Sequence, residues 1–260
     1  MKELRFLLAV WKTNLQSNME YRVSFLMQVL GMMLNNAFYF LIWVIFFDRF
    51  RSVQGWGLSD MYVTFGITAS AFGLVALFFG NALFLGDIIT KGRMDYYLSF
   101  PRPVLLHAVA SRSVASGLGD LTYGFISFAA SGTFTWEGLA RFVVAVLLAA
   151  VVFASFMMII QSLAFWIGTT SYISGLAMNA MITFAIYPIS LFDTGARLIL
   201  FTLIPAALMG AVPAAFVHSF GWDTLAELFA GAMALLGLAI AIFKIGLRRY
   251  ESGSAIQVEV

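Results

Sequence analysis

The sequence predicts an all-α integral membrane protein with six transmembrane helices. The first observation is composition: 62% of the 260 residues are hydrophobic, only 11% are charged, and the mean hydropathy is +0.93. Soluble domains carry about 25% charged residues, and a chain of this size cannot bury so much apolar surface in its own core. The other two observations are uncharged runs long enough to cross a bilayer and basic residues gathered in alternate connecting segments, as membrane insertion favours.

Residues 1–20 predict an amphipathic helix that lies in the membrane surface. Apolar side chains recur at helical spacing at Leu4, Leu8, Trp11 and Leu15. Polar and basic side chains fall on the opposite face at Lys2, Arg5, Lys12 and Gln16. A basic face of this kind suits the anionic headgroups of a bilayer. We expect no cleavable signal peptide here, because no small-residue cleavage site follows a short apolar core.

The six predicted spans are the runs that approach or exceed the roughly 20 apolar residues needed to cross the hydrocarbon core. They cover residues 23–47, 62–85, 113–136, 142–167, 175–192 and 225–245. The fourth and fifth spans come from one uncharged stretch that is too long for a single crossing. We divide it at residues 168–175, where turn-forming residues cluster.

Residues 198–217 are also apolar, but they are interrupted at Pro205, Gly210 and Pro213. With six spans and a cytoplasmic N-terminus, eleven of the 15 Lys and Arg residues lie in cytoplasmic segments, and the C-terminus is cytoplasmic too. A seventh span would move the basic residues after the last run to the outside, against the positive-inside rule. We therefore expect an outer re-entrant or interfacial helical hairpin, whose broken backbone is tolerated where protein buries it.

The longest polar segment, residues 86–103, lies between the second and third spans on the cytoplasmic side. It predicts one short amphipathic helix that is stopped by proline at Pro101. A plain basic loop would satisfy the charge rule alone, but the mixture of side chains indicates a docking surface instead. The apolar members are Ile88, Ile89, Tyr96, Tyr97, Leu98 and Phe100, and the charged members are Lys91, Arg93 and Asp95.

Asp120 is the one acidic residue well inside an apolar run. An ionisable group at this depth is costly and is a functional candidate by default. Three glycines close to it indicate a tight helix contact, so a structural anchor that bonds across this contact is the favoured interpretation. Intramembrane amides usually bridge helices, and Asp120 with Asn35 and Asn81 forms the candidate intramembrane polar site. The other amides at this depth are Asn36, Gln161 and Asn179.

Several function classes are excluded or lack support. The chain has no G-x-x-x-x-G-K-[ST] phosphate loop, no H-E-x-x-H or G-x-S-x-G motif, and no cysteine. We therefore expect no bound cofactor, no metal and no catalytic residue of its own. The net charge of +2 is too small to indicate nucleic-acid binding. The partner that composition does indicate is the lipid bilayer.

The order of elements resembles that of the six-span permeases of ABC-type exporters of the type-two class. The resemblance is most specific in an I-x-x-G-x-[LM]-D-x-x-L-x-x-P pattern, formed by Ile89, Gly92, Met94, Asp95, Leu98 and Pro101. Two further stretches, 20–22 and 117–124, are similar to the same bacterial branch of drug, antibiotic and viologen exporters. The resemblance covers essentially the whole chain, which we treat as a single permease domain, residues 1–260.

The resemblance implies a mechanism. The polar segment would be the coupling helix that docks into a separate ABC ATPase, present in two copies, which would hold ATP and magnesium. A second, related permease would complete the complex, as a heterodimer by preference or else a homodimer, in the bacterial plasma membrane. The outer gate would be the hairpin with Pro205, Gly210 and Pro213. The coupling residues would be Ile89, Lys91, Arg93, Met94, Asp95, Tyr96 and Leu98.

The substrate implied by this resemblance is a hydrophobic or amphipathic small molecule. An alternative from another class is a stand-alone secondary transporter or channel that uses Asp120 as an intramembrane ion site. A third, a membrane-embedded enzyme, has no catalytic constellation in the sequence to support it.

Overall fold

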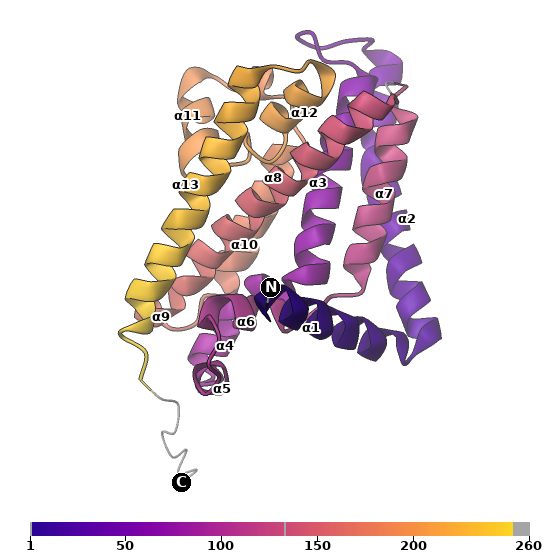
Figure 1. Cartoon of the computed structure of the whole chain (residues 1–260). Helices are drawn as coiled ribbons and strands as arrows, with labels where there is room; N and C mark the ends of the chain where they lie inside the picture. Colours follow the sequence, from indigo (N-terminus) through magenta and orange to yellow (C-terminus); the bar gives the residue numbers. More distant parts are fainter. Residues whose placement is uncertain (1, 133, 252–260) are drawn as a thin grey trace.

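The computed structural model describes residues 2–132 and 134–251, and within them every regular element is helical. The ends of the chain that the sequence predicts to be cytoplasmic, Met1 and residues 252–260, lie outside the described residues. Long helices run between two opposite ends of the molecule, and short helices close each end (Figure 1). This layered arrangement of apolar helices agrees with a multi-pass membrane protein.

The described residues contain both long and short helices. In order they are α1 (Lys2–Met19), α2 (Arg22–Arg49), α3 (Leu58–Phe78), η1 (Gly80–Leu83), α4 (Leu85–Thr90), α5 (Met94–Leu98), α6 (Val104–Ala110), α7 (Ser116–Ala130), α8 (Trp136–Ser162), α9 (Ala164–Ile167), α10 (Ser171–Ala185), η2 (Ile189–Leu191), α11 (Thr194–Thr202), α12 (Ala211–His218) and α13 (Trp222–Leu247).

Four helical segments in the described part are long and apolar enough to cross a membrane, where the sequence predicts six spans. These four are Arg22–Arg49, Leu58–Phe78, Trp136–Ile167 and Trp222–Leu247. The other two predicted spans correspond to α7 and α10, of 15 residues each. Fifteen residues of α-helix extend about 22 Å, less than the roughly 30 Å of a hydrocarbon core. Helix α7 ends early because Gly132 adopts a left-handed conformation, with φ 78°.

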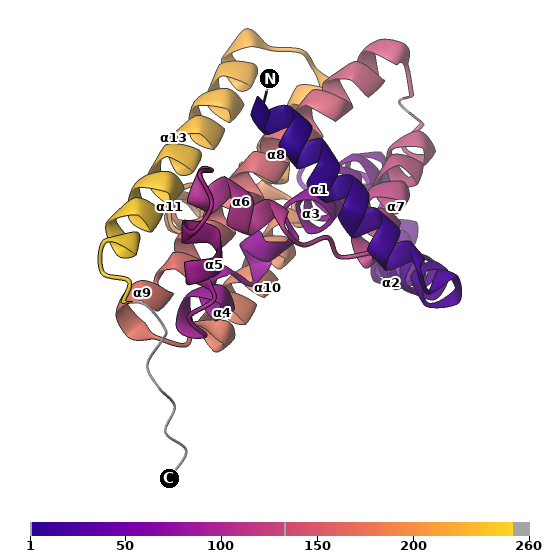
Figure 2. The same cartoon turned by 60° about the horizontal axis from the view of Figure 1, so that its bottom comes forward.

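Helix α1 confirms the predicted N-terminal helix, and it lies across one end of the molecule beside α6 (Figure 2). Leu4, Leu8 and Leu15 are exposed as expected for a membrane-facing side. Trp11 differs from the prediction, because its indole Nε1 donates to the carbonyl of Phe78 at 2.7 Å. On the same face of α1, Asn14 donates to the carbonyl of Ala110 at the end of α6, at 3.3 Å, and Asn18 donates to the carbonyl of Ser113, at 3.2 Å. Helix α1 is therefore fixed to the protein as well as amphipathic.

Helices α3 and α7 make the closest backbone contact in the core. A Cβ atom added to Gly73 would lie 2.5 Å from the carbonyl oxygen of Gly117, and one added to Gly124 would lie 2.5 Å from that of Gly66. Cβ atoms do not approach backbone this closely, so only glycine permits the observed separation. The stripe of small residues lets the two helices pack by van der Waals contact, which is the main attraction available to helices in lipid.

Helix α8 occupies the centre of the larger hydrophobic core. Phe142 and Phe153 on α8 are fully buried, as is Phe128 on α7. The rings of Phe128 and Phe142 are stacked, with centroids 4.4 Å apart. Around α8 pack α3, α10, α12 and α13. A displacement of α8 would therefore displace the helices packed around it, because close-packed interiors transmit strain.

The glycine contact between α3 and α7 generates a prediction about stability. Gly73→Ala should lower the free energy of unfolding by about 1–3 kcal/mol, because the new methyl group overpacks the interface. Gly31→Ala is the matched control, since Gly31 lies within α2 and a Cβ atom there meets nothing within 4 Å. That control should be neutral or stabilising by about 0.5–1 kcal/mol. Thermal unfolding in detergent measures both, and equal midpoints for the two variants would contradict the close contact.

Candidate functional site

The polar segment between α3 and α7 forms two short helices, α4 and α5, and not the single helix predicted over 86–103. Gly92 separates them with a φ of 67°. This left-handed conformation ends α4, since residues with a Cβ atom rarely adopt it. After α5, Pro101 and Pro103 precede α6, which begins at Val104. The segment therefore turns back on itself at the same end of the molecule as α1 (Figure 2).

The predicted coupling residues divide into a buried set and an exposed set. Ile89 and Met94 are buried, Met94 with 0% of its surface accessible, so they hold the segment to the body of the protein. Asp95 is half-buried. The side chains that face outward and are available to a partner are Lys91, Arg93, Tyr96 and Leu98. We call these four residues the exposed strip.

Gln161 of α8 attaches α4 to the body of the protein. Its side chain is buried and its Oε1 accepts the backbone N–H of Gly86 at 3.0 Å and the hydroxyl of Thr170 at 3.3 Å. Its Nε2 donates to the carbonyl of Leu83. With both ends of the amide engaged, a shift of α4 requires a shift of the end of α8 or the loss of these hydrogen bonds. The sequence predicts Gln161 as one of the intramembrane amides that bridge helices, but not which groups it bonds.

His107 on α6 lies at the centre of an aromatic cluster that joins three elements. Its ring makes edge contacts with Phe6 of α1 and Tyr97 of α5, with centroids 5.0 and 5.1 Å apart. Phe100 contacts the same imidazole at 5.2 Å. We call this set the His107 cluster, and sequence reasoning did not find it. The available signal was the aromatic content of residues 96–100, without any indication of their common neighbour.

An ion pair reinforces the His107 cluster from outside. Arg102 Nη1 lies 3.0 Å from Glu3 Oε1, and the Arg102 guanidinium also sits 4.4 Å from the centre of the Phe6 ring. Cation–π contacts of this kind contribute about 0.5–1 kcal/mol at exposed sites. Together with the cluster, they connect α5 and α6 to α1.

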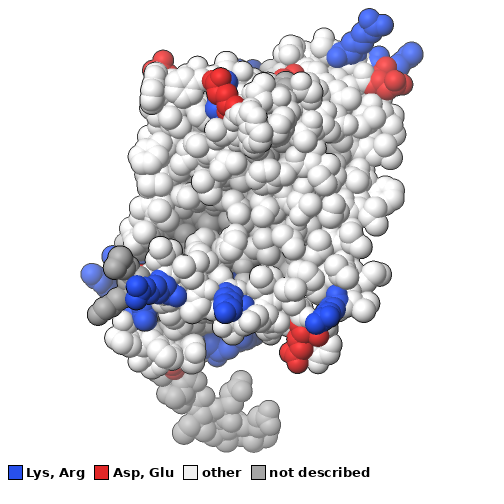
Figure 3. Space-filling model, turned by 45° about the vertical axis from the view of Figure 1, so that its right-hand side comes forward, with Lys and Arg blue, Asp and Glu red and all other residues white. Residues whose placement is uncertain are grey.

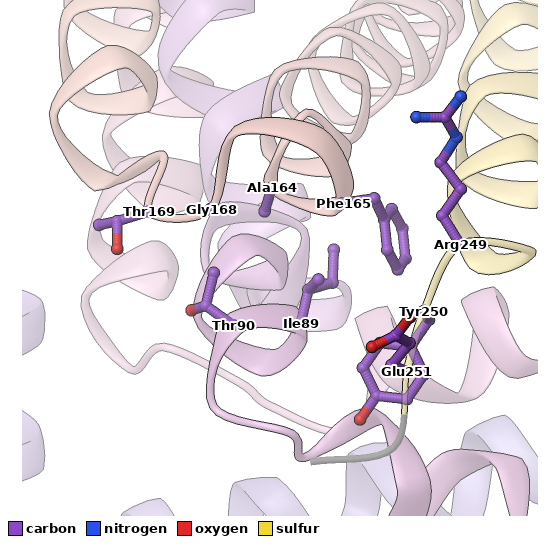
Figure 4. A pocket seen from close by; sticks show the side chains of 9 residues that line it. All are labelled: Ile89, Thr90, Ala164, Phe165, Gly168, Thr169, Arg249, Tyr250 and Glu251. Atoms are coloured by element: carbon purple, nitrogen blue, oxygen red, sulfur yellow. The ribbon is translucent and has the colours of Figure 1, made fainter. Parts of the chain in front are cut away.

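A small pocket of about 300 Å³ lies between α4 and α9 (Figure 4). Ile89 of α4 lies between Thr90 of the same helix and Phe165 of α9, and Arg249, which follows α13, lies beyond Phe165. The lining of the pocket thus includes both apolar and polar side chains, and the pocket lies next to α4, which leads into the exposed strip. Among the described residues, no group of three or more His, Asp and Glu side chains could hold a metal ion.

Asp120 is buried, with 2% of its surface accessible, and it bonds to an asparagine that is not a member of the predicted polar site. Asn36 Nδ2 donates to Asp120 Oδ1 at 2.7 Å, whereas Asn35 is exposed on α2. Asn81 is not part of this contact and donates instead to the carbonyl of Ala108 at 2.9 Å. The three predicted members therefore do not form one polar site. Asp120 joins α7 to α2, in line with the favoured anchoring interpretation.

The predicted outer hairpin consists of α11 and α12 at the end opposite α1 (Figure 1). It starts four residues earlier than predicted, because Asp193 caps α11 by accepting the backbone N–H of Ala196 at 2.7 Å. Pro205, Gly210 and Pro213 are all buried.

The second helix of the hairpin is attached to two long helices. Arg141 of α8 donates to the carbonyl of Val217 at 3.2 Å. His218 Nε2 lies 3.0 Å from Asp60 Oδ1 at the start of α3. Helix α8 therefore contacts the hairpin through Arg141 at one end and the polar segment through Gln161 at the other.

Comparison with known families decides the class of the protein. A family model described as ABC-2 family transporter protein matches residues 33–254, well over half of the chain. The chain belongs to the ABC-2 transporter family. It is thus the membrane permease of an ABC transporter, and the family implies association with an ABC ATPase. No curated protein matches the chain.

The anchoring role of Asp120 in this ABC-2 permease predicts a graded response to substitution. Asp120→Asn should unfold close to the unmodified protein, because its amide oxygen still accepts from Asn36. Asp120→Leu should cost about 1–2 kcal/mol, because it leaves the buried Asn36 amide unpaired. Asn35→Leu is the control and should have little effect. Thermal unfolding in detergent checks the order, and equal losses for Asn and Leu at position 120 would contradict it.

The His107 cluster predicts a dependence of stability on pH. Burial lowers the pKa of His107, and the nearby Arg102 guanidinium lowers it further. Because the unfolded chain then binds a proton more readily than the folded one, the cluster's stability is complete above the usual histidine pKa of about 6.5 and falls as the pH drops below it. Unfolding midpoints between about pH 8 and pH 5.5 should show this loss.

His107→Gln should remove that pH-dependent loss, whereas His218→Gln should retain it. These two positions are the only histidines in the chain. An unchanged pH profile in His107→Gln would refute the assignment to the cluster.

Proposed function

We propose that this permease is one subunit of an ATP-driven exporter that moves a hydrophobic or amphipathic small molecule across the bacterial plasma membrane. The observation that carries the proposal is the exposed strip, which runs from the end of α4 along α5 at one end of the molecule. Gln161 and the His107 cluster fix the segment to the body of the protein. A surface of this kind suits the transmission of force from a partner, because both of its attachments lead directly into other helices.

The proposed topology has six spans, with α7 and α10 as the two short ones and both termini in the cytoplasm. Its support is the distribution of charge. The end formed by α1, α4, α5, α6 and the last turn of α13 carries most of the basic residues, and Figure 3 shows such a row along the lower end below an uncharged surface. Positive residues remain cytoplasmic during insertion. The opposite end, with α11 and α12, is then the outer side.

Energy enters through two copies of the ATPase, which hold ATP and magnesium. Their closure displaces α4 and α5, and the displacement passes through Gln161 to α8. Helix α8 has 27 residues, which corresponds to about 40 Å, so it reaches from the docking end to the outer hairpin. There Arg141 meets α12, and the hairpin with Pro205, Gly210 and Pro213 serves as the outer gate.

A second permease completes the transporter, with a heterodimer of related chains preferred over a homodimer. The support is the resemblance to the exporter branch together with the largely exposed apolar faces of α2 and α13. Faces of this composition suit either lipid or another apolar helix. Asp120 takes part in this proposal only as an anchor between α2 and α7.

Substitution within the exposed strip tests the docking role. Arg93→Glu should weaken binding of the ATPase about tenfold, because a rim charge of the wrong sign costs on the order of 1.4 kcal/mol. ATP hydrolysis should then proceed without transport. The measurements are co-purification of the ATPase and substrate-dependent ATP hydrolysis in proteoliposomes.

Arg5→Glu is the matched control, since Arg5 is an exposed basic residue at the same end on α1. It should leave coupling unchanged. Normal ATPase binding and coupled transport in Arg93→Glu would contradict the docking proposal. If the unmodified permease is purified with no ATPase bound to it, the exporter proposal itself is wrong.

A further inference from the structure

A large apolar cavity of about 900 Å³ lies between α3, α8 and α13, separate from the exposed strip and from the outer hairpin. Helix α6, which lies between α13 and α3 in Figure 2, and Trp11 of α1 also contribute to the lining. Ligand pockets in proteins measure about 300–1,000 Å³ and are lined mainly by apolar side chains. The size and lining of this cavity therefore suit a hydrophobic ligand.

The cavity is open at the molecular surface. Leu147, which lines it, has 53% of its surface accessible, and Lys244 on its lining is also exposed. Both residues lie on helices that are long and apolar enough to cross the bilayer. A ligand would thus enter sideways from the membrane and not from the aqueous end of the molecule.

The length of the cavity matches the depth of one leaflet. Along α8 its lining extends from Leu147 to Met158, a rise of about 16 Å. Half of a hydrocarbon core is about 15 Å. On α13 the lining runs from Leu236 to Lys244, so the basic residue marks the headgroup end. An extended acyl chain lying parallel to the helices fits this dimension.

Two polar groups of the lining indicate the chemistry of the ligand. Lys244 has no acidic side chain within ion-pair distance in the described part of the chain, and no described residue that lines the cavity is acidic. Ser155 is fully buried, and its hydroxyl has no hydrogen-bond partner among the described residues. A buried hydroxyl normally has a partner, and the ester carbonyl of a lipid below its headgroup would supply one.

We propose that this cavity binds an acyl chain of an anionic phospholipid from the adjacent leaflet, with Lys244 at the headgroup and Ser155 at the ester. This goes beyond the proposed transport function, since it requires neither the ATPase nor a transported molecule. Cationic side chains near a membrane surface each favour anionic lipid by about fivefold. Preference for an anionic headgroup is therefore the measurable signature.

The test uses the full chain in phosphatidylcholine nanodiscs that contain a trace of photoreactive lipid. Phosphatidylglycerol and phosphatidylcholine carrying the same photoreactive acyl chain are compared, and labelled peptides are located by mass spectrometry. Residues 147–158 and 236–244 should be labelled about fivefold more by phosphatidylglycerol. Equal labelling of these peptides by the two lipids would overturn the proposal.

Two pairs of variants separate this site from general contact with lipid. Ala154→Trp fills the cavity and should abolish its labelling, whereas Leu30→Trp on the exposed face of α2 should not. Lys244→Glu should remove the preference for phosphatidylglycerol, whereas Arg248→Glu, which makes the same charge change outside the cavity, should keep it. Lys244 is exposed, so that variant tests the proposal even if Ala154→Trp does not fold. Labelling that survives Ala154→Trp in folded protein would refute the site.

Discussion

The Gln161 side chain holds α4 against α8 at Gly86, a position where no residue larger than glycine fits. A Cβ atom on Gly86 would lie 2.5 Å from Gln161 Oε1 and would also meet the hydroxyl of Thr170. The amide therefore does more than satisfy its own hydrogen bonds, because it fixes the position of the polar segment relative to a long helix. The pocket beside α4 and the start of the polar segment both lie next to this attachment. In a low-dielectric interior, such a fully bonded amide is costly to break.

Features that depend on composition were predictable from the sequence, and features that depend on rotation about a helix axis were not. The membrane class follows from apolar content, and the hairpin follows from two prolines and the balance of charge. Asn35 and Asn36 have the same chemistry, but successive residues point about 100° apart on a helix. Only the packing of α2 against α7 decides that Asn36, and not Asn35, meets Asp120.

The polar segment shows the same limit in a different way. Its role as an exposed, mixed surface could be predicted from its residues, but its division at Gly92 depends on a single backbone conformation. The His107 cluster brings together Phe6 and Phe100, which are far apart in the sequence. Pairwise contacts over such separations are set by tertiary structure and leave no local pattern. Gln161 is predictable only in part, since its place within the membrane could be predicted from the sequence and its hydrogen-bond partners could not.

Helix α8 has a thermodynamic consequence that follows from its position. It is bonded to the polar segment through Gln161 and to the outer hairpin through Arg141, and its middle turns form one wall of the apolar cavity. If a change at either end shifts α8, the shape of the cavity changes with it. Linkage is reciprocal. If a shift of α8 changes the binding free energy of a molecule in the cavity, then binding of that molecule changes the free energy of the shift by the same amount. The composition of the surrounding leaflet would then set the work needed for each transport cycle.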